Sequence, residues 1–174
     1  MTQRAIVVFE SMFGNTRLLA ETVALGIGEH LPTSVLDAAN APTRLGPEIG
    51  LLVVGAPTHA MGLPRSSTRE DAVRKFPERA RAATDGVREW LTSLECSNRI
   101  LTATFDSRVH TPVYLGSAAR GIARRMHRLG FEVDSVASFY VGGTTGPLDE
   151  GEISRARAWG AALAQKAAQL HAVG

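Results

Sequence analysis

The sequence predicts an α/β fold in which helices cover both faces of a five-stranded parallel sheet. Two observations lead to this fold class. Short apolar runs rich in β-branched residues recur along the chain, and such runs are typical of parallel strands that are buried on both faces. Between them lie segments whose apolar residues repeat near a 3.6-residue period, which indicates helices. This regular alternation favours a doubly wound sheet with the strand order 2-1-3-4-5.

Five segments are predicted to form the strands. Residues 5–9 (AIVVF) and 51–54 (LLVV) are short and strongly apolar, whereas residues 34–37 (SVLD) give a weaker signal. Two longer segments, residues 99–105 (RILTATF) and 133–141 (VDSVASFYV), complete the set. In a sheet of this kind the ligand crevice lies at the carboxyl ends of the strands that neighbour the first one. Functional residues are therefore expected in the loops that follow the first, third and fourth strands.

Four segments are predicted to form helices. Residues 16–30 carry a periodic apolar face, and Pro32 prevents the helix from continuing. Residues 86–94 and 117–129 also have helical patterns, and residues 152–173 form a long alanine-rich segment. The first three helices lie between predicted strands, as crossover connections between parallel strands require, and the last one follows the final strand.

The composition fits one globular domain over residues 1–174, with 44% hydrophobic residues. No segment has the eighteen or so consecutive apolar residues of a membrane helix, and the first ten residues lack the apolar region of a secretory signal. We therefore expect a soluble cytoplasmic protein that does not contact membranes. A net charge of only +2 gives no reason to expect a nucleic-acid partner.

The cysteine content restricts the kinds of redox chemistry that are open to the chain. Cys96 is the only cysteine, which excludes an internal disulfide and a zinc or iron–sulfur site built from cysteines. The histidines and acidic residues show no metal-ligand spacing, so no metal is expected. Any redox activity would therefore depend on a bound cofactor.

A polar loop with one glycine follows the first strand and leads directly into a helix. Gly14 permits close approach of a ligand to the backbone, and Ser11, Asn15 and Thr16 bring polar side chains near the free N–H groups of the helix. Together with the helix dipole, these groups form a pocket for phosphate that needs no lysine. The alternative from this loop alone is that Ser11 or Thr16 only caps the helix and Gly14 only forms a turn.

The segment from Ser11 to Thr16, SMFGNT, resembles the phosphate loop of flavodoxins. It is most similar to the variant with an aromatic residue before glycine, which occurs in the flavodoxin domains of flavodiiron proteins and related quinone reductases. The resemblance implies a flavodoxin-like fold and one bound flavin mononucleotide (FMN). Side chains and backbone N–H groups of this loop would hold the ribityl phosphate. The residues implied are Ser11, Met12, Phe13, Gly14, Asn15 and Thr16.

The loop at residues 55–64 resembles the Gly-x-Pro-Thr loop that passes one face of the flavin ring in this family. Pro57 would set the backbone direction, and Thr58 would donate a hydrogen bond to the ribityl chain or the phosphate. His59 lies where many flavodoxins place a residue that flanks the ring, although an exposed loop histidine is the alternative. The residues implied are Pro57, Thr58, His59, Ala60, Met61 and Gly62.

The loop predicted after the fourth strand departs from the family pattern. Flavodoxins usually have a tyrosine there that lies flat on the ring, but Tyr114 comes too late in this sequence. Phe105, Arg108 or His110 would have to cover that face. Asp106 and Arg108 are alternatively expected to pair with each other at the surface. The residues implied are Phe105, Asp106, Ser107 and Arg108.

The predicted function is electron transfer, or reduction of a small acceptor, through bound FMN. The chain would be a carrier for a redox partner protein or an oxidoreductase, depending on how open the ring is, and no catalytic side chain is required. The alternative is a non-catalytic module of the same fold that has lost FMN. Such a module would bind a protein partner through the arginine stripe at residues 120, 124 and 128. The oligomeric state is left open.

Overall fold

The structure is a computed structural model that describes residues 3–81, 85–95, 99–111 and 116–172. Its five strands form one parallel sheet in the order β2-β1-β3-β4-β5, which confirms the predicted topology. The strands span the ranges β1 Arg4–Phe9, β2 Thr33–Asp37, β3 Ile49–Pro57, β4 Leu101–Val109 and β5 Val133–Val141.

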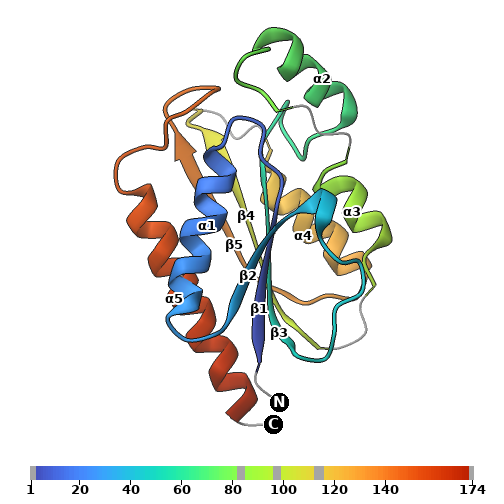
Figure 1. The fold of residues 1–174 in the computed structure, drawn as a ribbon, viewed down its shortest axis with the longest axis vertical. Coiled ribbons are helices and arrows are strands. Elements are labelled where there is room, and N and C mark those ends of the chain that lie inside the picture. Colours follow the sequence, from blue (N-terminus) through green and yellow to red (C-terminus); the bar gives the residue numbers. More distant parts are fainter. Residues whose placement is uncertain (1–2, 82–84, 96–98, 112–115, 173–174) are drawn as a thin grey trace.

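Helices cover both faces of the sheet (Figure 1). Helices α1 (Asn15–Gly28) and α5 (Glu152–Ala172) pack on one face, and α3 (Val87–Ser93) and α4 (Ala118–Arg128) pack on the other. A short 3₁₀ turn, η1 (Ala38–Asn40), follows β2. Both chain ends lie at the amino end of the sheet, opposite the edge where a ligand crevice is expected (Figure 1).

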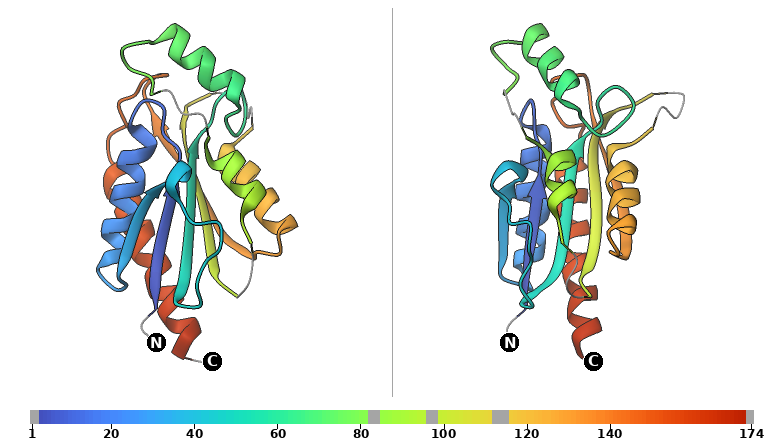
Figure 2. Two further views of the ribbon diagram at one scale, coloured as in Figure 1. Left: turned by 45° about the vertical axis from the view of Figure 1, so that its right-hand side comes forward. Right: turned by 90° about the vertical axis from the view of Figure 1, so that its right-hand side faces the viewer.

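One helix, α2 (Ser66–Lys75), was not predicted from the sequence. It lies beyond the carboxyl ends of the strands and covers neither face of the sheet (Figure 2). Its sequence, SSTREDAVRK, is strongly polar, and only Arg69 and Ala72 are buried. A helix with so narrow a buried face leaves no apolar periodicity by which it can be recognised.

Strands β3 and β4 continue three or four residues beyond the ends predicted from their apolar runs. Pairing reaches Pro57 opposite Ser107, and β4 then continues beside β5 as far as Val109 opposite Val141. Asp106 therefore lies within a strand and not in a loop. The polar side chains of this extension find partners inside the fold, so the strand can continue where its hydrophobicity ends.

Helices α1 and α5 approach each other closely because each carries a glycine at the crossing. A Cβ atom on Gly26 would meet the backbone carbonyl of Arg157, and one on Gly160 would meet that of Val23. This contact fixes α1, and thereby its first turn, against the sheet. In the described part of the chain, no helix has the length and apolar character needed to cross a membrane.

Candidate functional site

The first turn of α1 has no side chain that caps it. Its N-cap is Gly14, whose φ of 93° lies in the left-handed region, and a Cβ atom built there would meet nothing within 4 Å. The Ser11 hydroxyl accepts a hydrogen bond from the Gly14 N–H at 3.1 Å, outside the helix. The part of the alternative in which Ser11 or Thr16 caps the helix is therefore wrong, whereas Gly14 does form a left-handed turn. Free N–H groups at this end favour an anion.

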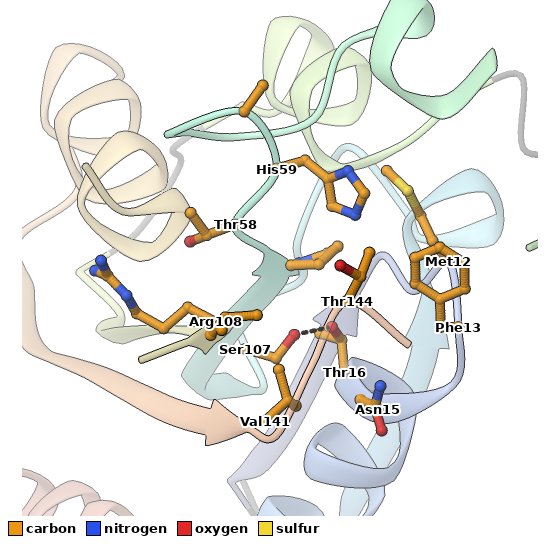
Figure 3. Close-up of a pocket in the computed structure, with 13 residues that line it drawn as sticks. Met12, Phe13, Asn15, Thr16, Thr58, His59, Ser107, Arg108, Val141 and Thr144 are labelled. Atoms are coloured by element: carbon orange, nitrogen blue, oxygen red, sulfur yellow. Dashed lines mark hydrogen bonds between the residues drawn. The ribbon is translucent and has the colours of Figure 1, made fainter. Parts of the chain in front are cut away.

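A buried pair of hydroxyls joins this turn to the sheet. Thr16 Oγ1 lies 2.8 Å from Ser107 Oγ, and both residues are buried (Figure 3). Thr16 belongs to the first turn of α1 and Ser107 to the end of β4. The hydrogen bond between them sets the position of the helix start relative to the strand ends.

A cavity of about 220 Å³ lies at the carboxyl ends of β3, β4 and β5, beside the first turn of α1 (Figure 3). The structure brings ten of the sixteen predicted site residues together around it. These are Met12, Phe13, Asn15, Thr16, Pro57, Thr58, His59, Ala60, Ser107 and Arg108. We refer to it below as the central cavity.

Three further residues line the central cavity and were not predicted. They are Val109, Val141 and Thr144, from the ends of β4 and β5 and the loop after β5. The predicted strand order places β5 beside β4, so the carboxyl end of β5 could have been included in the predicted site. That would have identified Val141 and Thr144.

Four predicted residues face other cavities nearby. Ser11 and Gly14 line a cavity of about 460 Å³ on the other side of the first loop. Met61 and Gly62 line a cavity of about 320 Å³ on the α4 side of the second loop. The first loop therefore borders open space on both sides, with Met12 contributing to both cavities.

Phe105 and Asp106 lie in the interior and line none of these cavities. The Phe105 ring is fully buried, with its centroid 6.1 Å from that of Phe139 and 6.2 Å from that of Trp159. Side chains alternate along β4, so Phe105 faces the helix α5 side and not the crevice. The expectation that Phe105 would cover the flavin ring is therefore not met.

Asp106 anchors the second loop from inside the protein. It is fully buried, and its Oδ2 atom accepts hydrogen bonds from Thr58 Oγ1 at 2.8 Å, Ser117 Oγ at 2.5 Å and the Ala119 N–H at 3.1 Å. The expectation that Asp106 pairs with Arg108 at the surface is therefore wrong, because Asp106 is buried. The carboxylate instead ties the end of β3 to the start of α4.

Two aromatic rings border the central cavity on one side. The rings of Phe13 and His59 lie nearly parallel, with centroids 6.1 Å apart, and Phe76 contacts the Phe13 ring edge-on at 5.5 Å. Burial lowers the pKa of His59, so this ring is neutral near pH 7. No described tyrosine lines the central cavity. The rings of His110 and Tyr140 stack with their centroids 3.8 Å apart, and both residues line a different cavity. Tyr114 lies outside the described residues.

A buried ion-pair network connects the start of the first loop to helices α2 and α3. Arg69 Nε donates to Glu10 Oε1 at 2.5 Å, and Arg69 Nη2 donates to Glu89 Oε2 at 2.7 Å. Burial alone would lower the pKa of Arg69, but its hydrogen bonds to both carboxylates outweigh burial and raise it. Glu10 immediately precedes Ser11, so the network holds α2 and α3 to the start of the first loop.

The described residues contain no group of three or more His, Cys, Asp or Glu side chains that is arranged to hold a metal ion. The central cavity is lined by hydroxyls, an imidazole and a guanidinium beside the N-terminal end of α1. Groups of these kinds can bind an anion and flank a planar ring.

Comparison with known proteins gives similarity at the level of structure only. No family model and no curated protein matches the sequence. A flavodoxin from the domain Archaea superimposes with a TM-score of 0.62 at 18% identity, covering 95% of this chain and 99% of the other. Flavodoxin 2 from Bacillus cereus gives 0.63 at 16% identity, over 94% and 99% of the two chains.

A third similar structure is the WrbA-like flavodoxin from Agrobacterium tumefaciens, with a TM-score of 0.58 at 16% identity, over 97% of this chain and 99% of that one. Such low identities carry information about architecture and not about activity. Together with the strand order, these likenesses show that this chain has the flavodoxin-like fold.

Proposed function

We propose that this chain binds one FMN at the carboxyl edge of its sheet and acts in electron transfer or in the reduction of a small acceptor. One observation carries the proposal: no side chain caps the first turn of α1, which begins after Gly14 and lies beside a cavity that the ends of β3, β4 and β5 complete. In flavodoxin-like sheets this position, next to the first strand, is where ligands bind. The structural likeness to flavodoxins supports the same choice of cofactor.

The residues present fit a phosphate at the first loop. Backbone N–H groups at the start of α1 and the side chains of Asn15 and Thr16 would bind its oxygens, and the Gly14 position leaves room for close approach. Hydrogen bonds to a charged phosphate are stronger than those between neutral groups, so no lysine is needed.

The residues present also fit a planar ring next to that phosphate. Pro57 and Thr58 line the central cavity together with His59, whose neutral imidazole presents a flat face. Val109 and Val141 add apolar surface at the strand ends, which excludes water from part of the cavity. When bound, FMN supplies the ability to take up and release electrons, while these residues bind and shield it.

A matched pair of glycine variants tests the proposal. Gly14 and Gly130 have nearly equal φ angles, 93° and 91°, and a Cβ atom at either would meet nothing within 4 Å. Gly14→Val and Gly130→Val should therefore cost similar stability through backbone strain, but only Gly14→Val places a side chain on the first loop.

We expect purified wild-type protein and the Gly130→Val variant to bind added FMN, seen as a shift of the flavin absorbance bands and a change in fluorescence. The Gly14→Val variant should bind FMN much more weakly. Equal binding by two folded variants would place the flavin elsewhere. Absence of binding in the wild type would favour a module that has lost FMN.

A further inference from the structure

A second cavity, of about 320 Å³, adjoins the central cavity through the second loop, and His59 and Ala60 line both. Four arginines line it: Arg65 at the start of α2, Arg88 on α3, and Arg124 and Arg125 on α4. We call it the arginine cavity. None of its lining residues is acidic.

The four guanidinium groups have no carboxylate within ion-pair distance in the described part of the chain. Most other described arginines do, such as Arg69 with Glu10 and Arg155 with Glu152. The arginine cavity therefore concentrates positive charge without a direct ion pair, and Glu89 offsets the charge of Arg88 only from a longer distance. Like charges gathered in this way repel one another, and an anion removes that repulsion.

Two of the arginines are held in place by the backbone. Arg88 donates to the carbonyl of Leu63 at 2.6 Å and to that of Pro64 at 2.9 Å, and Arg125 Nη1 donates to the Gly121 carbonyl at 3.0 Å. Burial lowers the pKa of both groups, and neighbouring arginines lower it further. Fixed, half-buried guanidinium groups lose little freedom when they bind a ligand.

The start of α2 adds a neutral hydroxyl to the same cavity. Ser67 and Thr68 line it, but the Thr68 hydroxyl donates to the Arg65 carbonyl at 2.9 Å and accepts from the Arg65 N–H at 2.8 Å, which leaves Ser67 as the hydroxyl available to a ligand. The first hydrogen bond within the helix runs from the Arg69 N–H to the Arg65 carbonyl at 3.0 Å. The N–H groups that precede this bond point out of the helix, where the helix dipole also favours negative charge. The arginine cavity thus combines charged and neutral donors on a concave surface.

We propose that the arginine cavity binds the phosphate or pyrophosphate group of a small-molecule ligand. Planar guanidinium groups match phosphate oxygens through paired hydrogen bonds, and several such groups suit a multiply charged anion better than a single carboxylate. A concave site favours a small molecule over the flat surface of an acidic protein. The proposal does not depend on FMN, although a ligand bound here would lie beside the central cavity.

The test is a calorimetric titration of the full chain with inorganic pyrophosphate at about 0.15 M ionic strength, where charges that do not contact the ligand are largely screened. We expect binding by the wild type and affinities at least about tenfold lower in Arg65→Gln and Arg125→Gln, because each removes a charge-assisted contact. Arg128→Gln makes the same charge change on α4 but does not line the cavity, so it should change affinity by less than about threefold. Thermal melts establish that each variant is folded.

Binding of pyrophosphate should persist in Gly14→Val, which separates this site from the first loop and from the FMN proposal. Competition by ADP with the same dependence on Arg125 would identify a nucleotide phosphate, whereas competition by inorganic phosphate alone would identify a free anion. Three results would overturn the proposal. The first is no binding at millimolar pyrophosphate, and the second is an equal loss of pyrophosphate affinity in Arg128→Gln. The third is a chain that does not bind pyrophosphate but binds an acidic protein in a way that depends on Arg125.

Discussion

The hydroxyls of Thr16 and Ser107 lie 2.8 Å apart in the protein interior, and they join the start of α1 to the end of β4. Either hydroxyl can be the donor. Because one partner belongs to the proposed phosphate loop and the other to the sheet, the two can be removed separately.

We expect Thr16→Ala to weaken FMN binding by about tenfold and to leave riboflavin binding little changed, since only FMN has a phosphate. Ser107→Ala is the matched control, because it breaks the same hydrogen bond without altering the loop. Both variants should lose about 1–3 kcal/mol of stability, since each leaves a buried hydroxyl unpaired. Fluorescence titrations with both ligands measure the difference. If both variants weaken FMN and riboflavin alike, Thr16 does not contact phosphate.

The buried pair of Arg69 and Glu10 should matter far more for stability than an exposed pair. Arg69→Met leaves the Glu10 carboxylate buried, and removal of one partner of a buried pair costs about 3–5 kcal/mol. Arg74→Met breaks an exposed pair with Asp71 on the same helix and should cost no more than about 1 kcal/mol. Urea unfolding of the two variants gives the comparison. Equal losses would show that the network does not hold α2.

The second loop turns through two residues in an unfavourable conformation. His59 and Gly62 exchange two backbone hydrogen bonds of 2.9 Å, and Ala60 and Met61 between them have φ angles of 43° and 68°. Such a turn favours glycine, and each left-handed residue with a side chain costs about 1–2 kcal/mol. We expect Met61→Gly to raise the unfolding free energy by about 1 kcal/mol.

Met61→Ala is the control for that change. Met61 as a residue is 63% exposed, so removal of its side chain beyond Cβ should alter stability by no more than about 0.5 kcal/mol. A thermal melt in which the glycine and alanine variants coincide would show that the turn is not strained.

Burial of His59 makes stability depend on pH. Its pKa in the folded protein is lower than the ordinary 6.5, so between the two values the unfolded chain binds more protons. Stability should therefore fall as pH drops below about 6.5 and level off once the folded protein also binds the proton. His59→Gln should reduce this slope in urea unfolding at several pH values, and an unchanged slope would show that His59 does not carry the pH dependence.

Arg108 lines the central cavity, but its side chain extends away from Phe13 and Thr16 (Figure 3). A cation near bound FMN favours electron uptake, so Arg108→Gln should lower the midpoint potential. Because solvent screens this half-buried charge, the effect should be about 1 kcal/mol, on the order of 20 mV for two electrons. Arg128→Gln on α4 should leave the potential unchanged. A redox titration that gives one potential for both variants would place Arg108 outside the influence of the flavin.

The sheet order could be predicted because buried parallel strands such as residues 5–9 and 51–54 are continuous apolar runs. Helix α2 could not, since a buried arginine and not an apolar face holds it. Polar strand ends were equally invisible: Asp106 and Ser107 look like a loop until their partners, Thr58 and Thr16, are placed.

The candidate site was predicted where sequence neighbours share one loop, as in the segment from Met12 to Thr16. It was missed where strands contribute alternate residues. Phe105 faces the core because β4 continues past it, and Val141 joins the cavity because β5 lies beside β4. Side chains on a strand point alternately to its two faces. If the true end of β4 had been known, this alternation would have placed Phe105 on the other face from Asp106.

The most direct measurement is the affinity of the wild-type protein for FMN compared with riboflavin, by fluorescence titration in the same buffer. The two ligands share the ring and the ribityl chain, so their difference isolates the phosphate at the first turn of α1. The account predicts that FMN binds at least about tenfold more tightly, since a single charge-assisted contact contributes about 1.5–3 kcal/mol. Equal affinities, or no binding of FMN, would contradict it.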